Sequence, residues 1–430
     1  MARTVLPGGL RVVTEHVPGA RSAAVGLWVD VGSRDEQGFH PQSRGAAHFL
    51  EHLLFKGTAR RSARQIAEEL DAVGGDLNAF TTKEQTCFYA HVLDSDVALA
   101  VDVVCDVVLN GVMAPDDVEL ERDVVLSEIA GRDEDPEDLL ADDFDDLLLG
   151  EHPLAGPVVG SEESVVEMSR DVIARFHAAH YVPSRSVLAV AGNVTHAGVL
   201  DAVVAAFGDR LTGGVDDGWV RPESAFAVPT PAQRLAVRDE DTEQAHVMLG
   251  VPSLRRGDPR WEAQLVLSTV LGGGTSSRLF QEIREQRGLA YSVYSAATGY
   301  SDLGVLNVYV GCAPDRLGTA AGVLRTQLAD LARDGITDAE LVRSRGQLRG
   351  EYVLGLEDTP SRMSWLGRRE LEGTHLPLDL TEALARVDAV TSADVAKLAA
   401  ELFDTPVTAA VVGPYADADD LPDELREVAR

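Results

Sequence analysis

A pair of histidines with a glutamate between them lies inside an otherwise apolar stretch of the sequence. Residues 46–55 read AAHFLEHLLF, so His48 and His52 stand at i and i+4. On an α-helix both imidazoles leave the same face, and Glu51 lies beside them. Buried polar side chains are costly unless they are paired. The stretch therefore requires a helix that buries an apolar face and still offers these three polar groups a partner.

The same residues could instead lie on a solvated helix surface, where histidine and glutamate are common. The neighbours favour burial, because Ala46, Leu50, Leu53 and Phe55 indicate a helix with a large apolar face. A metal ion would satisfy the two imidazoles. Glu51 would then be close enough to accept a proton from an attacking water without being a ligand itself.

Two imidazoles do not complete a catalytic zinc site, which usually takes three protein ligands and keeps the fourth position open. Residues 115–132 predict a helix, with proline at the start, acids in the first turn and glycine near the end. Glu121 and Glu128 lie two turns apart on one face of this helix. Either glutamate alone would more often be a solvated surface acid, since the chain has 70 acidic residues.

These motifs resemble those of a known family. HFLEH at 48–52, followed by Glu121 and Glu128, is similar to the pattern of the pitrilysin/insulinase zinc peptidases, the inverzincins. Length and motif spelling resemble the short branch, which includes the catalytic subunit of mitochondrial processing peptidase and its bacterial homologues. The resemblance extends over nearly the whole chain, and further matching stretches are residues 74–86, 152–163, 176–183 and 189–194.

The resemblance implies a role for each site residue. It makes His48, His52 and Glu128 the ligands of one zinc ion (Zn2+) per chain and Glu51 the general base. It makes Glu121 an acid that orients one of the ligands, a kind of contact that fixes the tautomer and direction of an imidazole. It also implies that Asn78, Ala79 and Phe80 belong to an edge strand that binds the substrate.

A second group of candidate residues lies in the other half of the chain. Arg284 and Tyr291 match the position of an Arg/Tyr pair that, in the family, contacts the substrate and helps to stabilise the tetrahedral intermediate. A guanidinium and a phenol are suitable donors to a developing oxyanion. Without the family spacing, a surface arginine beside a packed tyrosine would be the favoured interpretation, and Arg287 is the main rival to Arg284.

The domain organisation follows from a linker and a repeat. Residues 212–232 are rich in glycine, proline and aspartate, as expected of a linker between domains 1–211 and 233–430. Residues 169–192 resemble residues 392–413, which indicates a duplicated unit. We expect an α+β fold of two homologous α/β-roll domains, each a mixed or antiparallel sheet with helices packed on one face. The second copy lacks the metal-binding residues, so only the first half should hold the metal.

Composition narrows the functional classes. The net charge of −32 excludes a general nucleic-acid binder, because phosphate binding needs a positive surface. No apolar run approaches the roughly 18 residues of a membrane span, so no membrane partner is expected. The N-terminus lacks the apolar region of a signal peptide, and three cysteines without CxxC spacing fit a reducing compartment. We therefore expect a cytoplasmic protein.

These observations predict a zinc-dependent endopeptidase that hydrolyses extended or unfolded peptides. The alternative is a non-catalytic structural or partner subunit of a processing-peptidase-like complex. Relatives of that kind usually lose ligands or the base, whereas this chain keeps His48, Glu51, His52 and Glu128. Long family members enclose a chamber with four homologous units, and one chain here has two. The resemblance therefore implies a homodimer.

Overall fold

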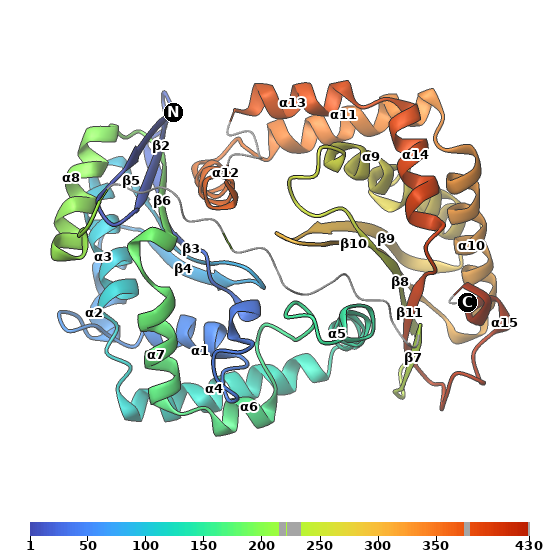
Figure 1. The fold of residues 1–430 in the computed structure, drawn as a ribbon, viewed down its shortest axis with the longest axis horizontal. Coiled ribbons are helices and arrows are strands. Elements are labelled where there is room, and N and C mark those ends of the chain that lie inside the picture. Colours follow the sequence, from blue (N-terminus) through green and yellow to red (C-terminus); the bar gives the residue numbers. More distant parts are fainter. Residues whose placement is uncertain (215–220, 222–233, 374–378, 429–430) are drawn as a thin grey trace. The chain divides into compact units, whose positions relative to one another are not determined.

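The structure, a computed structural model, describes residues 1–214, 221, 234–373 and 379–428 (Figure 1). The chain forms two compact units. The first comprises Met1–Ala130, Gly156–Pro222 and Val353–Leu378, and the second comprises Gly131–Ala155, Glu223–Tyr352 and Asp379–Arg430. Most of the predicted linker 212–232 lies outside the described residues, so the division of the chain at that segment stays a prediction.

The first unit is built on a mixed sheet of six strands in the described part of the chain, in the order β1-β2-β6-β3-β5-β4. The strands are β1 (Ala2–Val5), β2 (Arg11–His16), β3 (Ser22–Val29), β4 (Asp76–Thr81), β5 (Thr86–Leu93) and β6 (Ser186–Gly192). The helices are α1 (Ala46–Leu54), α2 (Ala63–Asp71), α3 (Val97–Asn110), most of α4 (Pro115–Asp133), α6 (Glu162–Glu167), α7 (Arg170–His180), α8 (His196–Phe207) and α12 (Thr359–Glu372), with short 3-10 turns η1 (Ser33–Glu36), η2 (Asp94–Asp96), η3 (Pro183–Arg185) and η4 (Gly208–Arg210).

The second unit has a sheet of five strands among the described residues, in the order β7-β11-β8-β10-β9. The strands are β7 (Leu235–Asp239), β8 (Ala245–Ser253), β9 (Ala290–Gly299), β10 (Gly304–Cys312) and β11 (Thr408–Gly413). The helices are α5 (Pro136–Leu149), α9 (Trp261–Gly272), the π-helix η5 (Phe280–Glu285), the 3-10 turn η6 (Pro314–Arg316), α10 (Leu317–Asp334), most of α11 (Asp338–Leu354), α13 (Leu380–Ala389), α14 (Ser392–Phe403) and α15 (Asp423–Val428).

The two sheets share one topology. Without β1, the first sheet runs β2-β6-β3-β5-β4, which matches β7-β11-β8-β10-β9 strand for strand. In both sheets the outer pair, β2 with β6 and β7 with β11, is parallel, and the remaining pairs are antiparallel. The predicted fold class of two homologous α/β domains is confirmed.

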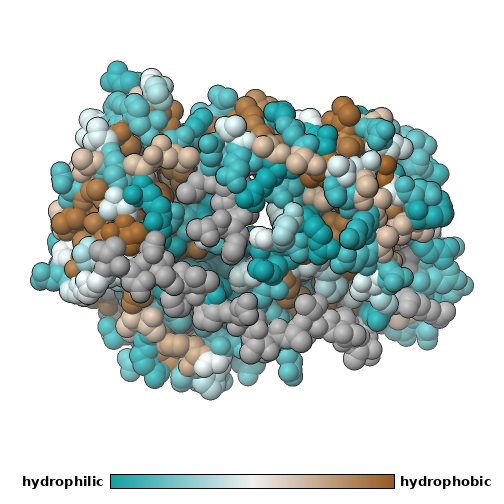
Figure 2. Space-filling view, turned by 45° about the horizontal axis from the view of Figure 1, so that its top comes forward, coloured by the Kyte–Doolittle hydropathy of each residue, from teal (hydrophilic) through white to brown (hydrophobic). Residues whose placement is uncertain are grey.

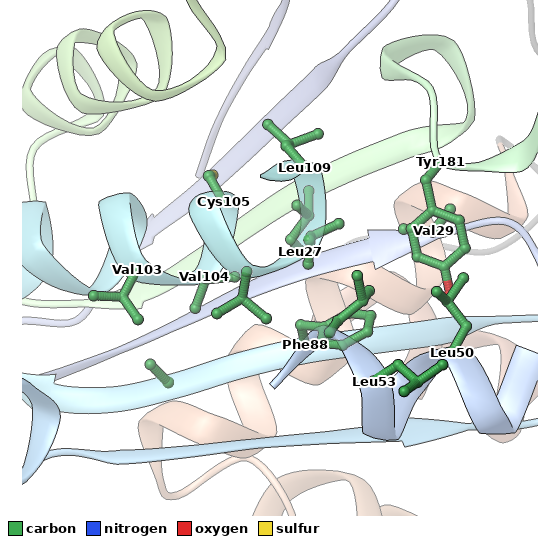
Figure 3. Close-up of a cluster of buried hydrophobic side chains, with 14 of the residues drawn as sticks. Leu27, Val29, Leu50, Leu53, Phe88, Val103, Val104, Cys105, Leu109 and Tyr181 are labelled. Atoms are coloured by element: carbon green, nitrogen blue, oxygen red, sulfur yellow. The ribbon is translucent and has the colours of Figure 1, made fainter. Parts of the chain in front are cut away.

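The core of the first unit lies between its sheet and the helices on one face. Leu50 and Leu53 of α1 are fully buried and lie with Val29 of β3 and Phe88 of β5 (Figure 3). This apolar contact fixes the face of α1 that meets the sheet. The polar residues of the helix are therefore left on its other side.

Each sheet also carries a helix on its second face, which the sequence did not predict. In the first unit that helix is α12, orange in Figure 1, which packs on β3 and β6 although it comes from the second half of the chain. Trp28 Nε1 donates to Met363 Sδ at 3.4 Å, and a Cβ at Gly367 would lie 2.1 Å from the same indole nitrogen. Glycine at this position is therefore required for the close approach.

The second unit shows the reciprocal arrangement. Its second sheet face is covered by α5, which comes from the first half of the chain and packs on β8 and β11. Phe144 and Leu148 of α5 are fully buried there, in one cluster with Met248 and Tyr309. Helix α5, from the first half of the chain, is therefore part of the second unit, and helix α12, from the second half, is part of the first unit.

One face of the molecule is drawn with its residues coloured by hydropathy (Figure 2). The face drawn in Figure 2 is mostly coloured as hydrophilic, in keeping with the acidic composition. Among the described helices, none combines the length and the apolar character that a membrane crossing requires.

Candidate metal centre and active site

Helix α1 presents three polar side chains together. It begins after Gly45, whose φ of 87° lies in the left-handed region that favours glycine, and a Cβ there would lie 2.6 Å from the carbonyl oxygen of Val159. With Leu50 and Leu53 directed into the core, His48, Glu51 and His52 remain partly exposed on the other side. The rings of the two histidines lie with their centroids 4.8 Å apart.

Helix α4 brings the third member of the cluster. Glu128 Oε2 lies 3.7 Å from His48 Nε2 and 3.5 Å from His52 Nε2. The ligand atoms of these three residues all lie within 4.8 Å of one another, so together they could hold a metal ion. Two imidazoles and one carboxylate are the donor set of many catalytic zinc sites.

The second glutamate of α4 lies behind His52 and does not belong to the three-residue cluster. Glu121 is 4% exposed, and its Oε2 lies 3.2 Å from His52 Nδ1. Its other oxygen forms an ion pair with Lys56. A carboxylate in this place accepts the Nδ1 proton, which leaves the Nε2 lone pair of His52 directed at Glu128.

Glu51 has a specific partner on the neighbouring strand. Thr81 Oγ1, at the end of β4, donates a hydrogen bond of 2.5 Å to Glu51 Oε2. Burial raises the pKa of Glu51 above its ordinary value, while the hydrogen bond from Thr81 lowers it. A raised pKa suits a carboxylate that must accept a proton and later release it.

His48 is held in its neutral form. Burial and the neighbouring His52 lower its pKa to about 4. Its Nδ1 is buried and has no hydrogen-bond partner among the described residues. A neutral imidazole is the form that binds a metal, because the coordinating nitrogen needs its lone pair.

Strand β4 forms the edge of the first sheet and contains Asn78, Ala79 and Phe80. Within the described chain, β4 pairs with β5 alone. Ala79 lies against the core beneath α1, whereas Phe80 lies on the opposite face, where its ring meets Trp28 edge to face at 5.5 Å. The amide of Ala79 donates to Asn78 Oδ1 at 2.8 Å.

The backbone of β4 alternates between its partner strand and its free edge. Thr82 N donates to the carbonyl oxygen of Gln85 at 2.8 Å, and the same register pairs Phe80 with Cys87. In an antiparallel ladder the residues between such pairs direct their N–H and C=O groups the other way. Ala79 and Thr81 therefore face the free edge of the sheet with their backbone groups.

Arg284 and Tyr291 lie together in the second unit. The Arg284 guanidinium stacks over the Tyr291 ring at 4.5 Å and over the Phe280 ring at 4.8 Å. Arg284 sits on the π-helix η5, a form often found at functional sites. A bulge in β9 leaves Tyr291 unpaired and 79% exposed. The rival, Arg287, turns instead to Glu282.

Two sequence families match this chain. Residues 11–162 match Insulinase (Peptidase family M16), and residues 167–348 match the Peptidase M16 inactive domain. The chain belongs to peptidase family M16. The resemblance to the pitrilysin/insulinase peptidases is thereby confirmed, and so is the assignment to an enzyme family.

Whole-length relatives of this M16 chain bear consistent names. An uncharacterized zinc protease of Mycobacterium leprae is 54% identical, with 99% of this chain and 94% of the relative covered. Proteins with the same description from Streptomyces coelicolor and Bacillus subtilis are 46% and 39% identical, over 96% of this chain and 90% and 98% of theirs.

Solved structures agree on the fold. An M16 inactive domain from Pseudomonas fluorescens gives a TM-score of 0.86 at 20% identity, covering 98% of this chain and 99% of that one. A protease from Helicobacter pylori also gives 0.86, at 23% identity, covering 96% and 99%. At these identities the likeness shows the M16 fold alone.

Sequence reasoning missed two residues that contact the candidate site, Thr81 beside Glu51 and Lys56 beside Glu121. Thr81 directly follows the predicted edge-strand residues, and the period-2 alternation from Ala79 would have placed its side chain on the side of α1. Lys56 lies one turn beyond His52, so helical spacing could have linked it to Glu121 only once the contact between α1 and α4 was known.

Proposed function

We propose that this M16 chain is a zinc-dependent endopeptidase that hydrolyses extended or unfolded peptides. The observation that carries the proposal is the convergence of His48, His52 and Glu128 within 4.8 Å. Glu51 stands on the same helix as the histidines but outside this cluster. That arrangement separates metal binding from proton transfer.

The residues fit a zinc ion. His48 would bind through Nε2, since this nitrogen and Nε2 of His52 both face Glu128. Glu121 would orient His52 through Nδ1, and it is not part of the three-residue cluster that could hold the metal. Three protein ligands leave one position open, as a catalytic site requires. A single Zn2+ per chain follows, because the second unit has no comparable cluster among its described residues.

The protein groups would divide the work of hydrolysis. When bound, zinc lowers the pKa of a water molecule and polarises a peptide carbonyl. Glu51 would accept the proton of the attacking water and transfer it to the leaving amine. Thr81, on β4, would fix the orientation of the Glu51 carboxylate by donating a hydrogen bond to Oε2. The other carboxylate oxygen, Oε1, would then be available to accept the proton.

The substrate would bind along β4. The backbone groups of Ala79 and Thr81 at the free edge can pair with an extended peptide by β-augmentation. The Ala79 amide, held by Asn78 in this structure, would exchange that partner for a substrate carbonyl. Recognition through the backbone tolerates many side chains, which supports extended or unfolded segments as the substrate class.

We further infer that the active enzyme is a homodimer. Arg284 stacks on the exposed ring of Tyr291, the two side chains could donate to a substrate carbonyl, and both belong to the unit without the metal cluster. By the mapping onto longer M16 members, the pair of one chain would serve the zinc of the other. The proposed homodimer therefore has two equivalent composite sites.

The non-catalytic subunit remains the contrasting hypothesis. The cluster of His48, His52 and Glu128 and the presence of Glu51 on the same helix support the enzyme over this alternative, since non-catalytic relatives usually lose ligands or the base. The three cysteines are buried and unpaired, which supports work in a reducing compartment such as the cytoplasm.

One experiment separates the two functions. The purified protein should contain about one zinc per chain and cleave a panel of unfolded peptides. A chelator should abolish cleavage, and added zinc should restore it. Zinc binding without cleavage of any peptide would favour the non-catalytic subunit. Absence of zinc binding would contradict the proposal that His48, His52 and Glu128 form a metal site.

A further inference from the structure

A buried glutamate outside the metal cluster contacts the start of α1. Glu36, the last residue of the 3-10 turn η1, is 3% exposed. Its Oε2 accepts from the amide of Gly45 at 2.7 Å, and its Oε1 accepts from the amide of Ala47 at 2.9 Å. Both oxygens therefore bind backbone donors at the N-terminus of the helix that carries His48, Glu51 and His52.

Helix α1 has no cap of its own. Its N-cap residue is Gly45, which has no side chain to accept from the first turn, and no acidic residue lies in that turn. The first amides of a helix have no partner within the helix, and the positive end of the helix dipole lies there. Glu36 supplies from a distant turn both the acceptors and the negative charge that local sequence normally provides.

The turn that carries Glu36 is itself fixed. Its neighbour Asp35 receives hydrogen bonds from Arg185 and from Arg221, and its Oδ2 accepts from the amide of Gly32. Burial raises the pKa of Glu36 well above its ordinary value, while the bonds from Ala47 and Gly45 oppose that shift. Since both oxygens face N–H donors, the carboxylate is the form that satisfies them.

His48 depends on this attachment more than His52 does. His52 is oriented by Glu121 through Nδ1, whereas His48 Nδ1 has no hydrogen-bond partner among the described residues. The direction of the His48 ring is thus set by the backbone and packing of the first turn. Ala47, whose amide Glu36 holds, is the residue immediately before His48.

We propose that Glu36 is a positioning residue of the metal centre, which holds the first turn of α1 so that His48 meets His52 and Glu128. This inference rests on the proposed zinc function. Glu36 does not contact the cluster, so its effect must pass through the backbone of α1. Substitution of Glu36 should therefore affect the metal affinity and the metal coordination geometry more than it affects substrate binding or the stability of the unit.

The test is Glu36→Gln in the full-length protein. The amide keeps the shape but offers one acceptor oxygen, so one of the two helix amides loses its partner. We expect zinc affinity, measured by competition with a chelator, to fall about 10- to 100-fold, the range for groups that orient metal ligands. The visible spectrum of the cobalt-substituted protein should change, and kcat should fall with little change in KM.

A matched control is Glu370→Gln, which removes another buried carboxylate of the same unit. Glu370 is 7% exposed and pairs with Arg3 at 3.0 Å. This variant should lose thermal stability and keep the wild-type zinc affinity and cobalt spectrum. Glu36→Asp, which keeps the charge but shortens the reach, should recover part of the affinity lost in Glu36→Gln.

Each outcome decides the inference. Wild-type metal affinity and an unchanged cobalt spectrum in folded Glu36→Gln would overturn it. So would loss of the fold in both Glu36 variants, because Glu36 would then support the whole unit and not α1 in particular. If wild type itself bound no zinc, the proposed function would fail first, and that result is distinguishable because it needs no variant.

Discussion

Oε2 of Glu121 lies 3.2 Å from Nδ1 of His52, on the side of the imidazole opposite Glu128. One face of helix α4 thus contacts both nitrogens of the same ring, with Glu121 behind it and Glu128 in front. The two glutamates differ in surroundings, since Glu121 is buried and paired with Lys56 while the Glu128 side chain is 43% exposed. This difference leads to distinct expected effects of the two acids.

Glu128→Gln should remove most of the bound zinc, because an amide oxygen is a weaker ligand than a carboxylate. Glu121→Gln should keep more zinc and lose activity, with affinity lowered about 10- to 100-fold. Metal content by atomic absorption, with peptide hydrolysis in parallel, measures both effects. A stronger loss of zinc in Glu121→Gln than in Glu128→Gln would reverse the two roles.

Glu51→Gln should retain the metal and lose most hydrolysis. Glu51 stands outside the three-residue cluster, so its substitution leaves the ligands intact. General acid–base catalysis contributes about 100- to 10,000-fold, and we expect kcat to fall by at least the lower of these factors. Zinc content and peptide cleavage are measured on the same preparation. Turnover near the wild-type rate would exclude Glu51 as the base.

Thr81→Val should weaken catalysis without loss of metal. Valine keeps the shape of threonine but cannot donate to Glu51. The loss of one hydrogen bond, ~1 kcal/mol, corresponds to a decrease of about fivefold in kcat. Thr326→Val, on the exposed side of α10, is the control and should leave kcat unchanged. Equal kcat for wild type and Thr81→Val would show that the contact has no role in catalysis.

Mixing two inactive variants tests the composite site. A Glu51→Gln chain and a Tyr291→Phe chain should exchange subunits to form a dimer in which one site carries both defects and the other neither. Activity should then rise above that of either variant alone. The measurement is peptide cleavage over time after mixing, with mixed dimers verified by differently tagged chains. Demonstrated mixed dimers without recovery, or full activity in an isolated monomer, would place the whole site in one chain.

The stability of the second unit should depend on pH through Glu340. Burial would raise the pKa of Glu340, but the hydrogen bonds from Arg278 and Thr337 outweigh it and lower the pKa from 4.5 to about 2. A depressed folded-state pKa stabilises the protein above the unfolded value. The stabilisation is therefore present at neutral pH and is lost as the pH falls from 4.5 towards about 2.

The check compares chemical denaturation of wild type and Glu340→Gln across that range. Wild type should be more stable at neutral pH, and the difference should shrink as the pH falls. Glu382→Gln, which breaks an exposed pair with Arg386, should change stability little at any pH. A difference between wild type and Glu340→Gln that stays constant down to low pH would contradict the role assigned to Arg278.

Local patterns predicted the elements of the site well. The apolar spacing around His48 and His52 predicted helix α1, and the proline start with early acids predicted a helix over residues 115–132, which the structure shows as α4 (Pro115–Asp133). The repeat between residues 169–192 and 392–413 predicted two similar sheets, whose strand orders match. These signals succeed because helix periodicity and strand alternation act over a few residues, within reach of sequence inspection.

The contacts between distant segments were not predictable in the same way. Glu36 lies nine residues before Gly45, yet no short motif links a 3-10 turn to the cap of the next helix. The hydrogen bond from Thr81 to Glu51 depends on how β4 passes α1. Helix α12 packs on the first sheet and α5 on the second because each covers an apolar sheet face that the helices of the same half leave exposed. No local sequence pattern indicates which sheet face a helix from the other half will cover.

The sequence by itself determined which residues could bind a metal, since the order of His48, Glu51 and His52 on one helix face follows from helical geometry alone. The family resemblance implied that Glu128 joins the histidines and that Glu121 orients a ligand, and the tertiary structure shows Glu128 beside both histidines and Glu121 behind His52. Both glutamates lie on one face of α4, so their spacing alone does not tell which of them joins the histidines. The packing of α4 against α1 sets the offset between the helices, and that offset assigns each acid its place.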